Sequence, residues 1–268
     1  MRSYAAHATA NIGDGVNGDW PQIVGDLMAA RYGGVGMAMQ GAVGKTQPCR
    51  PHCAFTSPSN PSFSLSGRRA QITANYLAHV SRALSSATPV TGPVDAAQGR
   101  IREVITSPAV TGLFLAGGHA FGARLLRSTE PPWMNANTVS TVVAALRVGD
   151  VLFAGTPGES YPEIAFGIRD GLSGPREVVT LGLANDQLGY LIAPAAAYPV
   201  ITAQVAVNDN TIFNVSPTIG DHVMCADIAL ALETGFDGAS PPECAPYDAQ
   251  DAAGDPIANV PAGAIVVP

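Results

Sequence analysis

The stretch from Val151 to Tyr190 decides the fold, and it reads VLFAGTPGESYPEIAFGIRDGLSGPREVVTLGLANDQLGY. It opens with a short apolar run that a Pro-Gly pair ends, which is typical of a buried strand followed by a turn. Apolar residues then recur at three- and four-residue steps from Tyr161 to Ile168, so we expect a helix that closes at Gly171. A second apolar run, from Val178 to Leu183, predicts another strand.

A strand, a helix and a strand within so short a stretch form a βαβ unit, whose two strands lie parallel and end at the same edge of the sheet. Open α/β sheets hold their ligands at that edge. The edge would carry Glu159 from the first strand and Asn185 and Tyr190 from the second. A carboxylate and a phenol brought together there could bind a metal or move a proton. The structural alternative is that Glu159 sits at a helix N-terminus, where a negative charge is favoured by about 0.3–1 kcal/mol.

The flanking sequence extends this unit into a larger sheet. Two β-like runs, Thr138 to Arg147 and Val151 to Ala154, are joined by a short turn and predict an antiparallel hairpin. The predicted fold class is therefore α/β: a mixed β-sheet with flanking helices, including a βαβ unit at about 151–190. We expect one α/β domain over residues 1–236, followed by a Pro/Gly/Ala-rich tail over 237–268. The remaining expected elements are a helix begun by Pro21 and capped by Asp19, a strand at Val35–Met39, a helix at Arg68–Leu84, strands at Ile101–Ile105 and Ile201–Val207, and a helix at Met224–Leu232.

Composition limits the functional classes. The 268 residues are 47% hydrophobic but only 13% charged, which suits a folded globular protein with a surface of short polar side chains. A formal net charge of −7 and the lack of a Lys/Arg cluster beyond Arg68 and Arg69 argue against a nucleic-acid partner. The apolar runs are too short for a transmembrane segment, and the first residues do not resemble a signal peptide.

Four cysteines occur in two sets, Cys49 with Cys53 and Cys225 with Cys244. Their pairing is open, because four cysteines allow three connectivities. Two disulfides would fit the low-charge composition and an oxidising compartment. Free thiols are the next alternative, and a Cys-based metal site is disfavoured because the spacing around His52 is not that of a zinc finger.

Three separated segments, taken together, resemble the neutral (non-lysosomal) ceramidase family of secreted or surface zinc-dependent amidases. They are Tyr4-Ala5-Ala6-His7-Ala8-Thr9, Pro157-Gly158-Glu159, and Gly182-Leu183-Ala184-Asn185 to Gly189-Tyr190. The resemblance implies that His7, Glu159 and Tyr190 bind one Zn²⁺. Imidazole and carboxylate are ordinary zinc ligands, and the metal would activate water or polarise an amide carbonyl.

The chain also departs from the family pattern. The family places its catalytic serine in a Gly-Asp-x-Ser-Pro type segment, and the matching residues here, 44–48, put Gln47 at the serine position and Lys45 at the aspartate position. The hydroxyl of Thr46, one residue away, is the candidate replacement. Asn185 is the candidate for orienting a ligand or donating to a developing oxyanion. The family's upstream His-x-His type segment does not occur, so the resemblance covers only the later part of the catalytic domain.

The leading hypothesis is therefore a zinc-dependent hydrolase that cleaves an amide bond of a lipid-like N-acyl substrate, with peripheral membrane contact. The full-length form would be extracellular or attached to the cell surface. The second hypothesis is a non-catalytic relative or incomplete fragment that binds a lipid or glycan. A third is a structural secreted domain held by two disulfides.

Overall fold

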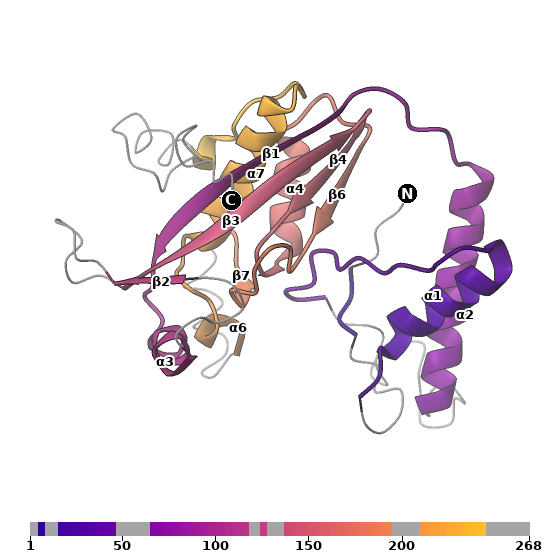
Figure 1. Cartoon of the computed structure of the whole chain (residues 1–268), viewed down its shortest axis with the longest axis horizontal. Coiled ribbons are helices and arrows are strands. Elements are labelled where there is room, and N and C mark those ends of the chain that lie inside the picture. The colour runs from indigo at the N-terminus through magenta and orange to yellow at the C-terminus, as the bar shows by residue number, and fades with distance from the viewer. Residues whose placement is uncertain are drawn as a thin grey trace. The chain divides into compact units, whose positions relative to one another are not determined.

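The structure is a computed structural model that describes residues 5–8, 16–46, 65–117, 124–127, 137–194 and 209–244. The chain forms two compact units, Met1–Pro89 and Val90–Pro268, shown together in Figure 1. The predictions that involve Gln47, Cys49, His52, Cys53 and the strand at Ile201–Val207 lie outside the described residues.

The second unit is built on one mixed sheet, which confirms the predicted fold class. Four strands run in the spatial order β1-β3-β4-β6, and β2 pairs with β3 beside that path. The β1, β2 and β4 strands are all antiparallel to β3, whereas β4 and β6 are parallel. The strands span Val94–Val104 (β1), Arg124–Arg127 (β2), Asn137–Val148 (β3), Val151–Gly155 (β4) and Glu177–Leu181 (β6).

The βαβ unit has the predicted form. Helix α4, Pro162–Asp170, joins β4 to β6, and Pro162 begins it at a position where a missing backbone N–H is tolerated. Ile164 and Ile168, one turn apart, are completely buried, so the apolar stripe read from the sequence packs into the core. The hairpin between β3 and β4 is confirmed as well, with Val148 opposite Val151 at its turn.

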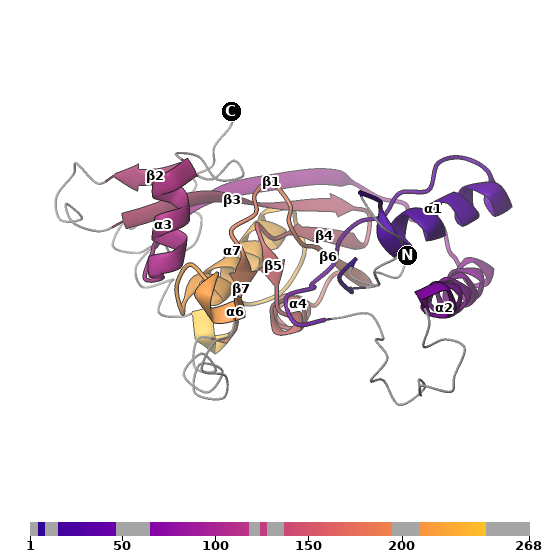
Figure 2. The ribbon, with the colours of Figure 1, turned by 90° about the horizontal axis from the view of Figure 1, so that it is seen from below.

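Helix α7, Ile219–Glu233, is the centre of the core. It contacts β1, β3 and β4 of the sheet and also α4, so α4 and α7 cover the same face (Figures 1 and 2). Residues on all its sides are buried, as expected of a helix packed between a sheet and other elements. Cys225 on α7 forms a disulfide with Cys244 in the short helix η3, Pro242–Cys244, which settles the open alternatives for these two cysteines.

Three short elements complete the second unit. They are the strands β5, Glu159–Ser160, and β7, Tyr190–Leu191, which form a separate two-stranded sheet, and helix α6, Asp209–Ile212. Helix α3, Pro108–Gly117, follows β1 and contacts α6.

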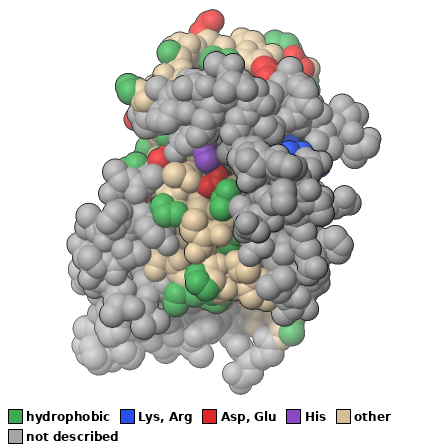
Figure 3. All heavy atoms as spheres, turned by 90° about the vertical axis from the view of Figure 1, so that its left-hand side faces the viewer, with side chains coloured by type: hydrophobic (Ala, Val, Ile, Leu, Met, Phe, Trp, Pro, Cys, Tyr) green, Lys and Arg blue, Asp and Glu red, His purple; other side chains and the backbone are tan. Residues whose placement is uncertain are grey.

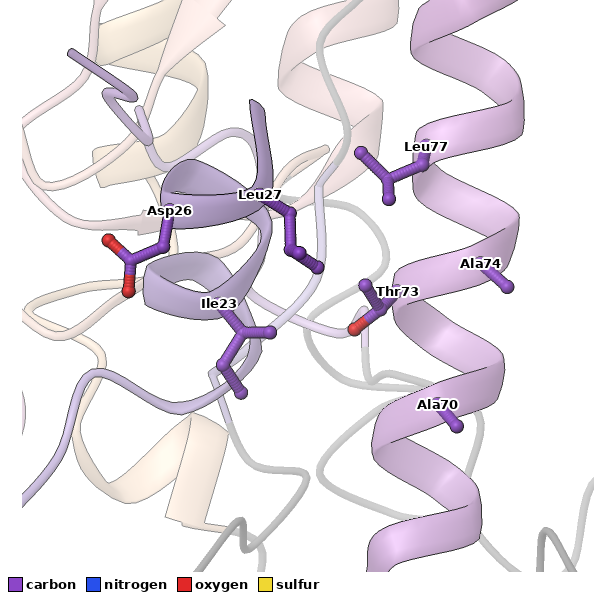
Figure 4. A pocket seen from close by; sticks show the side chains of 7 residues that line it. All are labelled: Ile23, Asp26, Leu27, Ala70, Thr73, Ala74 and Leu77. Atoms are coloured by element: carbon purple, nitrogen blue, oxygen red, sulfur yellow. The ribbon is translucent and has the colours of Figure 1, made fainter. Parts of the chain in front are cut away.

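The first unit is a pair of helices with an extended segment after the first helix. Helix α1 spans Asp19–Tyr32 and helix α2 spans Leu65–Ser85, which confirms the predicted helix at 68–84. The two helices line an open groove of about 710 Å³ (Figure 4). Leu27 on α1 and Thr73 and Leu77 on α2 point into the space between the helices.

Three local predictions were wrong. Val35–Met39 is not a strand, because the segment pairs with no described strand and Val35 is 95% exposed. Asp19 does not cap α1: it is the first residue of the helix, with a positive φ of 52°, and Gly18 occupies the cap position. The first strand of the sheet begins at Val94 rather than Ile101, because pairing with the long β3 extends it over polar residues.

Candidate functional site

The predicted edge lies at the carboxyl ends of β4 and β6, where backbone hydrogen bonds join the two following loops. The N–H of Thr156 donates to the carbonyl of Leu181 at 2.8 Å, and the N–H of Ala184 donates to the carbonyl of Thr156 at 2.9 Å. Further along, Leu188 N–H donates to Pro157 O at 2.9 Å. These bonds fix both loops to the rigid sheet, which is the support that a functional site needs.

Glu159 and Tyr190, the two residues expected to converge, are direct register partners. They pair in the parallel ladder of β5 and β7, and the N–H of Glu159 donates to the carbonyl of Gly189 at 2.7 Å. Register partners in neighbouring strands present their side chains on the same face of a sheet. Both side chains are partly buried, and Oε2 of Glu159 is out of contact with solvent. The carboxylate and the phenol therefore share one face of this edge.

The ladder continues to a third residue that the sequence did not indicate. Tyr190 also forms a parallel bridge with Asn214, and its N–H donates to the carbonyl of Phe213 at 3.1 Å. We call Glu159, Tyr190 and Asn214 the site row. The residues that follow them, Ser160, Leu191 and Val215, are all completely buried, and Leu191 and Val215 belong to the hydrophobic core. Because side chains alternate along a strand, the site row faces away from that core.

Two glycines allow the three backbones of the site row to come together. A Cβ added to Gly158 would lie 2.5 Å from the carbonyl oxygen of Gly189, and one added to Gly189 would lie 2.2 Å from that of Phe213. Gly189 also has a φ of +86°, a region that residues with a side chain rarely adopt. The three backbones can therefore approach this closely only because a glycine precedes Glu159 and another precedes Tyr190.

Asn185, the predicted oxyanion donor, lies in the loop after β6 and is exposed. Its φ is +69°, a left-handed conformation that asparagine tolerates better than most residues, so local geometry alone gives a reason for asparagine here. The neighbouring Asp186 anchors the loop, because it accepts a 2.6 Å hydrogen bond from the Thr141 hydroxyl on β3. Burial raises the pKa of Asp186, while this hydrogen bond, a backbone hydrogen bond from Val142 and the charge of Arg100 act in the opposite direction.

His7 and Thr46, the other two predicted site residues, are neighbours in the first unit. The backbone N–H of His7 donates to the carbonyl of Thr46 at 3.1 Å, and its carbonyl accepts a 2.9 Å hydrogen bond from the Trp20 indole. The hydroxyl of Thr46 donates to the carbonyl of Ala42 at 3.3 Å. The five predicted site residues thus fall into one group in each unit: His7 with Thr46, and Glu159 with Tyr190 and the more distant Asn185.

The site row offers oxygen donors, of which one, the carboxylate of Glu159, is a conventional zinc ligand. Within the described ranges, no three His, Cys, Asp or Glu side chains gather as a metal site would require. Glu159 is the one such residue in the row, and Tyr190 and Asn214 add oxygen atoms. A carboxylate is an ordinary zinc ligand. The side chain of Asn214 is completely buried, and its Oδ1 and Nδ2 lack hydrogen-bond partners among the described residues. It adds an unsatisfied polar group next to Glu159 and Tyr190.

A second polar cluster lies at the N-terminus of α7, and no motif in the sequence marks it. Glu103 on β1 accepts hydrogen bonds from Ser216 and from Thr218, the latter at 2.6 Å, and its other carboxylate oxygen contacts Nδ1 of His222. Ser216 also accepts from the backbone N–H of Ile219 at 3.1 Å. The cluster therefore satisfies the first backbone N–H of α7 and ties the helix to β1, and its compact internal bonding indicates a structural role.

On the one face drawn in Figure 3, the coloured Lys and Arg side chains occupy one small area. No helix in the described parts of the chain has both the length and the apolar character needed to cross a bilayer.

Comparison with known proteins finds similar solved structures but no similar sequences. No family model and no curated protein matches the sequence. The neutral ceramidase from Pseudomonas aeruginosa has a similar solved structure, with 15% identity and a TM-score of 0.59 over 90% of this chain and 46% of that chain. The fold of this chain is ceramidase-like. A ceramidase complexed with C2 agrees, with 15% identity and a TM-score of 0.57 over 90% of this chain and 47% of its own. The chain spans less than half the length of either protein.

Proposed function

We propose that this chain carries part of a zinc-dependent, ceramidase-like hydrolase that cleaves the amide bond of a lipid-like N-acyl substrate. The observation that carries the proposal is the register pairing of Glu159 with Tyr190 at the carboxyl edge of β4 and β6. The ceramidase-like fold supports it, because the resemblance to that family implies that these two residues bind zinc.

Three residues would hold the metal: Glu159 through its carboxylate, Tyr190 through its phenol, and His7 through its imidazole. Zn²⁺ would supply a Lewis acid that polarises a carbonyl and lowers the pKa of water. Among the chain's own groups, the backbone hydrogen bond between Glu159 and Gly189 holds the backbone that carries the carboxylate, and the two bridges of Tyr190 hold the backbone that carries the phenol. The three ligand types are compatible with one zinc ion that keeps an open position for substrate.

Two further residues would act on the substrate. Thr46 would offer its hydroxyl in place of the serine that the family uses, and Asn185 would donate its amide to the developing oxyanion. The exposure of Asn185 leaves its amide free to meet a substrate from the solvent side. A lipid-like substrate also implies contact with a membrane surface, and we propose an extracellular or cell-surface location for the full-length form.

Zinc content tests the metal part of the proposal. We expect elemental analysis of mildly purified protein to give about one zinc per chain. Glu159→Gln keeps the size of the side chain but removes its charge, and it should lose most of the metal. The matched control is Glu177→Gln at the amino end of β6, away from the predicted edge, which should retain it. A wild-type protein that neither contains nor takes up zinc would contradict the proposal.

Turnover tests the catalytic part. A fluorescent short-chain ceramide should be hydrolysed by the wild type and not by Glu159→Gln. Gln47 at the family's serine position favours a second candidate, a relative that binds a lipid or glycan without cleaving it. Zinc and ceramide binding without hydrolysis would select that candidate.

A further inference from the structure

Asn214, the third residue of the site row, is unusual because its side chain is both buried and without a hydrogen-bond partner among the described residues. Its side chain is completely buried, and neither Oδ1 nor Nδ2 has a hydrogen-bond partner in the described structure. A carboxamide offers one acceptor and two donors, and buried groups of this kind almost always use at least one of them. The Asn214 amide therefore has hydrogen-bonding capacity that a neighbouring group or a bound molecule can use.

The backbone around Asn214 is held firmly, so its position does not result from a loose loop. Phe213, before it, accepts the N–H of Tyr190 at 3.1 Å, and Val215, after it, accepts the N–H of Thr106 at 3.0 Å. The hydroxyl of Ser107 donates to the carbonyl of Ile212 at 2.6 Å. The chain is thus fixed on both sides of an asparagine that has no local use for its amide.

The direction of the Asn214 side chain follows from its pairing. Asn214 and Tyr190 are partners in a parallel bridge, and Tyr190 is in turn the partner of Glu159. Neighbouring strands lie about 4.8 Å apart, so Asn214 is one strand from Tyr190 and two strands from Glu159. In this ladder Tyr190 is the middle residue, so the Asn214 amide and the Tyr190 side chain start from neighbouring positions on one face.

We propose that Asn214 is a positioning residue of this site: with the metal bound, its amide hydrogen-bonds the phenol of Tyr190 and holds it in the orientation that ligates. This inference rests on the proposed function. Hydrogen bonds of this kind are often unmade in a ligand-free site and form when the ligand arrives. Groups that orient metal ligands typically change metal affinity about 10- to 100-fold when they are removed.

The test is zinc affinity, measured by competition with a chromophoric chelator, together with the melting temperature of the metal-free protein. Asn214→Leu keeps the bulk and removes the amide, so we expect about 10- to 100-fold weaker zinc binding. Metal-free Asn214→Leu should melt no lower than the wild type, because it loses a buried polar group that had no partner. Asn214→Ser should bind zinc more tightly than Asn214→Ala, which has nearly the same volume but no hydroxyl.

Two controls separate this role from a general effect. Thr180→Val on β6 removes another buried hydroxyl that has no partner, outside the site row, and should leave zinc affinity unchanged. In a Tyr190→Phe background, which keeps Glu159 and His7, Asn214→Leu should have no further effect, because a residue that acts through the phenol loses its target.

Each outcome decides between the two proposals. A wild type that binds no zinc overturns the proposed function and this inference with it. Zinc binding that is equally tight in the wild type, Asn214→Leu and Asn214→Ala overturns this inference alone. An undiminished effect of Asn214→Leu in the Tyr190→Phe background also overturns it, because Asn214 would then act without the phenol.

Discussion

The backbone N–H of His7 donates a 3.1 Å hydrogen bond to the carbonyl oxygen of Thr46. The proposed metal ligand and the proposed nucleophile of the first unit are therefore tied through main-chain atoms, not through their side chains. A substitution of the Thr46 side chain can leave this bond intact, so the role of the hydroxyl can be tested without moving His7.

Thr46→Val removes the hydroxyl and keeps the branched shape. The structural loss is one 3.3 Å hydrogen bond to the carbonyl of Ala42, which is worth about 1 kcal/mol or less. If Thr46 is the nucleophile, hydrolysis of a short-chain ceramide should fall to background while zinc content stays at the wild-type level. Full activity in Thr46→Val, measured with the same substrate, would remove Thr46 from the mechanism and leave the metal site standing.

Gly189→Ala should disturb the site row directly. The added Cβ would lie 2.2 Å from the carbonyl oxygen of Phe213, at a residue with φ of +86°, so both the backbone and its neighbour must shift. We expect a loss of about 1–3 kcal/mol in unfolding free energy from the strained backbone, together with weakened zinc binding. Urea denaturation and chelator competition measure the two effects.

Gly112→Ala is the matched control for that variant. Gly112 lies inside helix α3, and nothing is within 4 Å of the position that its Cβ would take. Alanine should therefore raise the unfolding free energy by about 0.5–1 kcal/mol through helix propensity and leave zinc binding unchanged. If Gly189→Ala behaved like Gly112→Ala, the close approach of the three backbones would not be needed for the site.

The parts of the fold that were predicted correctly are those with local signals. The stretch from Val151 to Leu181 has apolar runs, a periodic helix and Pro-Gly punctuation, each of which specifies its element within a few residues. The prediction at Val35–Met39 failed because an apolar run becomes a strand only if a partner strand is available, and partners are non-local. Val35 and Met37 are instead largely exposed beside the helices of the first unit.

The candidate site divides in the same way. The arrival of Glu159 and Tyr190 at one edge could be predicted, because the two residues follow neighbouring parallel strands of one βαβ unit, but their register pairing in a separate two-stranded sheet could not. Asn214 could not, because its bridge to Tyr190 depends on the path of the intervening chain and no motif marks it. The contact between Glu103 and His222 joins residues 119 positions apart, beyond the reach of any local pattern.

Glu103→Ala should be among the most destabilising substitutions in the second unit. The carboxylate accepts hydrogen bonds from Ser216 and Thr218 and contacts His222, and the Glu103 and His222 side chains are only 5% and 7% exposed. Removing the carboxylate leaves these buried hydrogen-bond donors without an acceptor, which costs about 1–3 kcal/mol for each. Urea denaturation should show this loss, whereas Glu177→Ala on the partly exposed start of β6 should change stability far less. Equal effects of the two substitutions would show that the cluster does not anchor α7.

Asp227 on α7 should make stability depend on pH. Its side chain is completely buried, both carboxylate oxygens lack hydrogen-bond partners within the described structure, and burial raises its pKa well above the usual value of 3.8. The folded state therefore binds this proton more tightly than the unfolded state does. Its contribution to stability is complete below about pH 4 and is lost as the pH rises toward the raised pKa, by up to about 1.4 kcal/mol per pH unit.

Asp227→Asn removes the ionisation and keeps the shape, so it isolates this effect from the other titrating groups. Between pH 4.5 and pH 8 the unfolding free energy of the wild type should fall relative to that of Asp227→Asn, and at pH 8 the variant should be the more stable protein. Urea denaturation of both proteins across this range gives the difference directly. If the unfolding free energies of the two proteins changed with pH in parallel, the ionised Asp227 carboxylate would have to gain a hydrogen-bond partner or contact with water in the folded state.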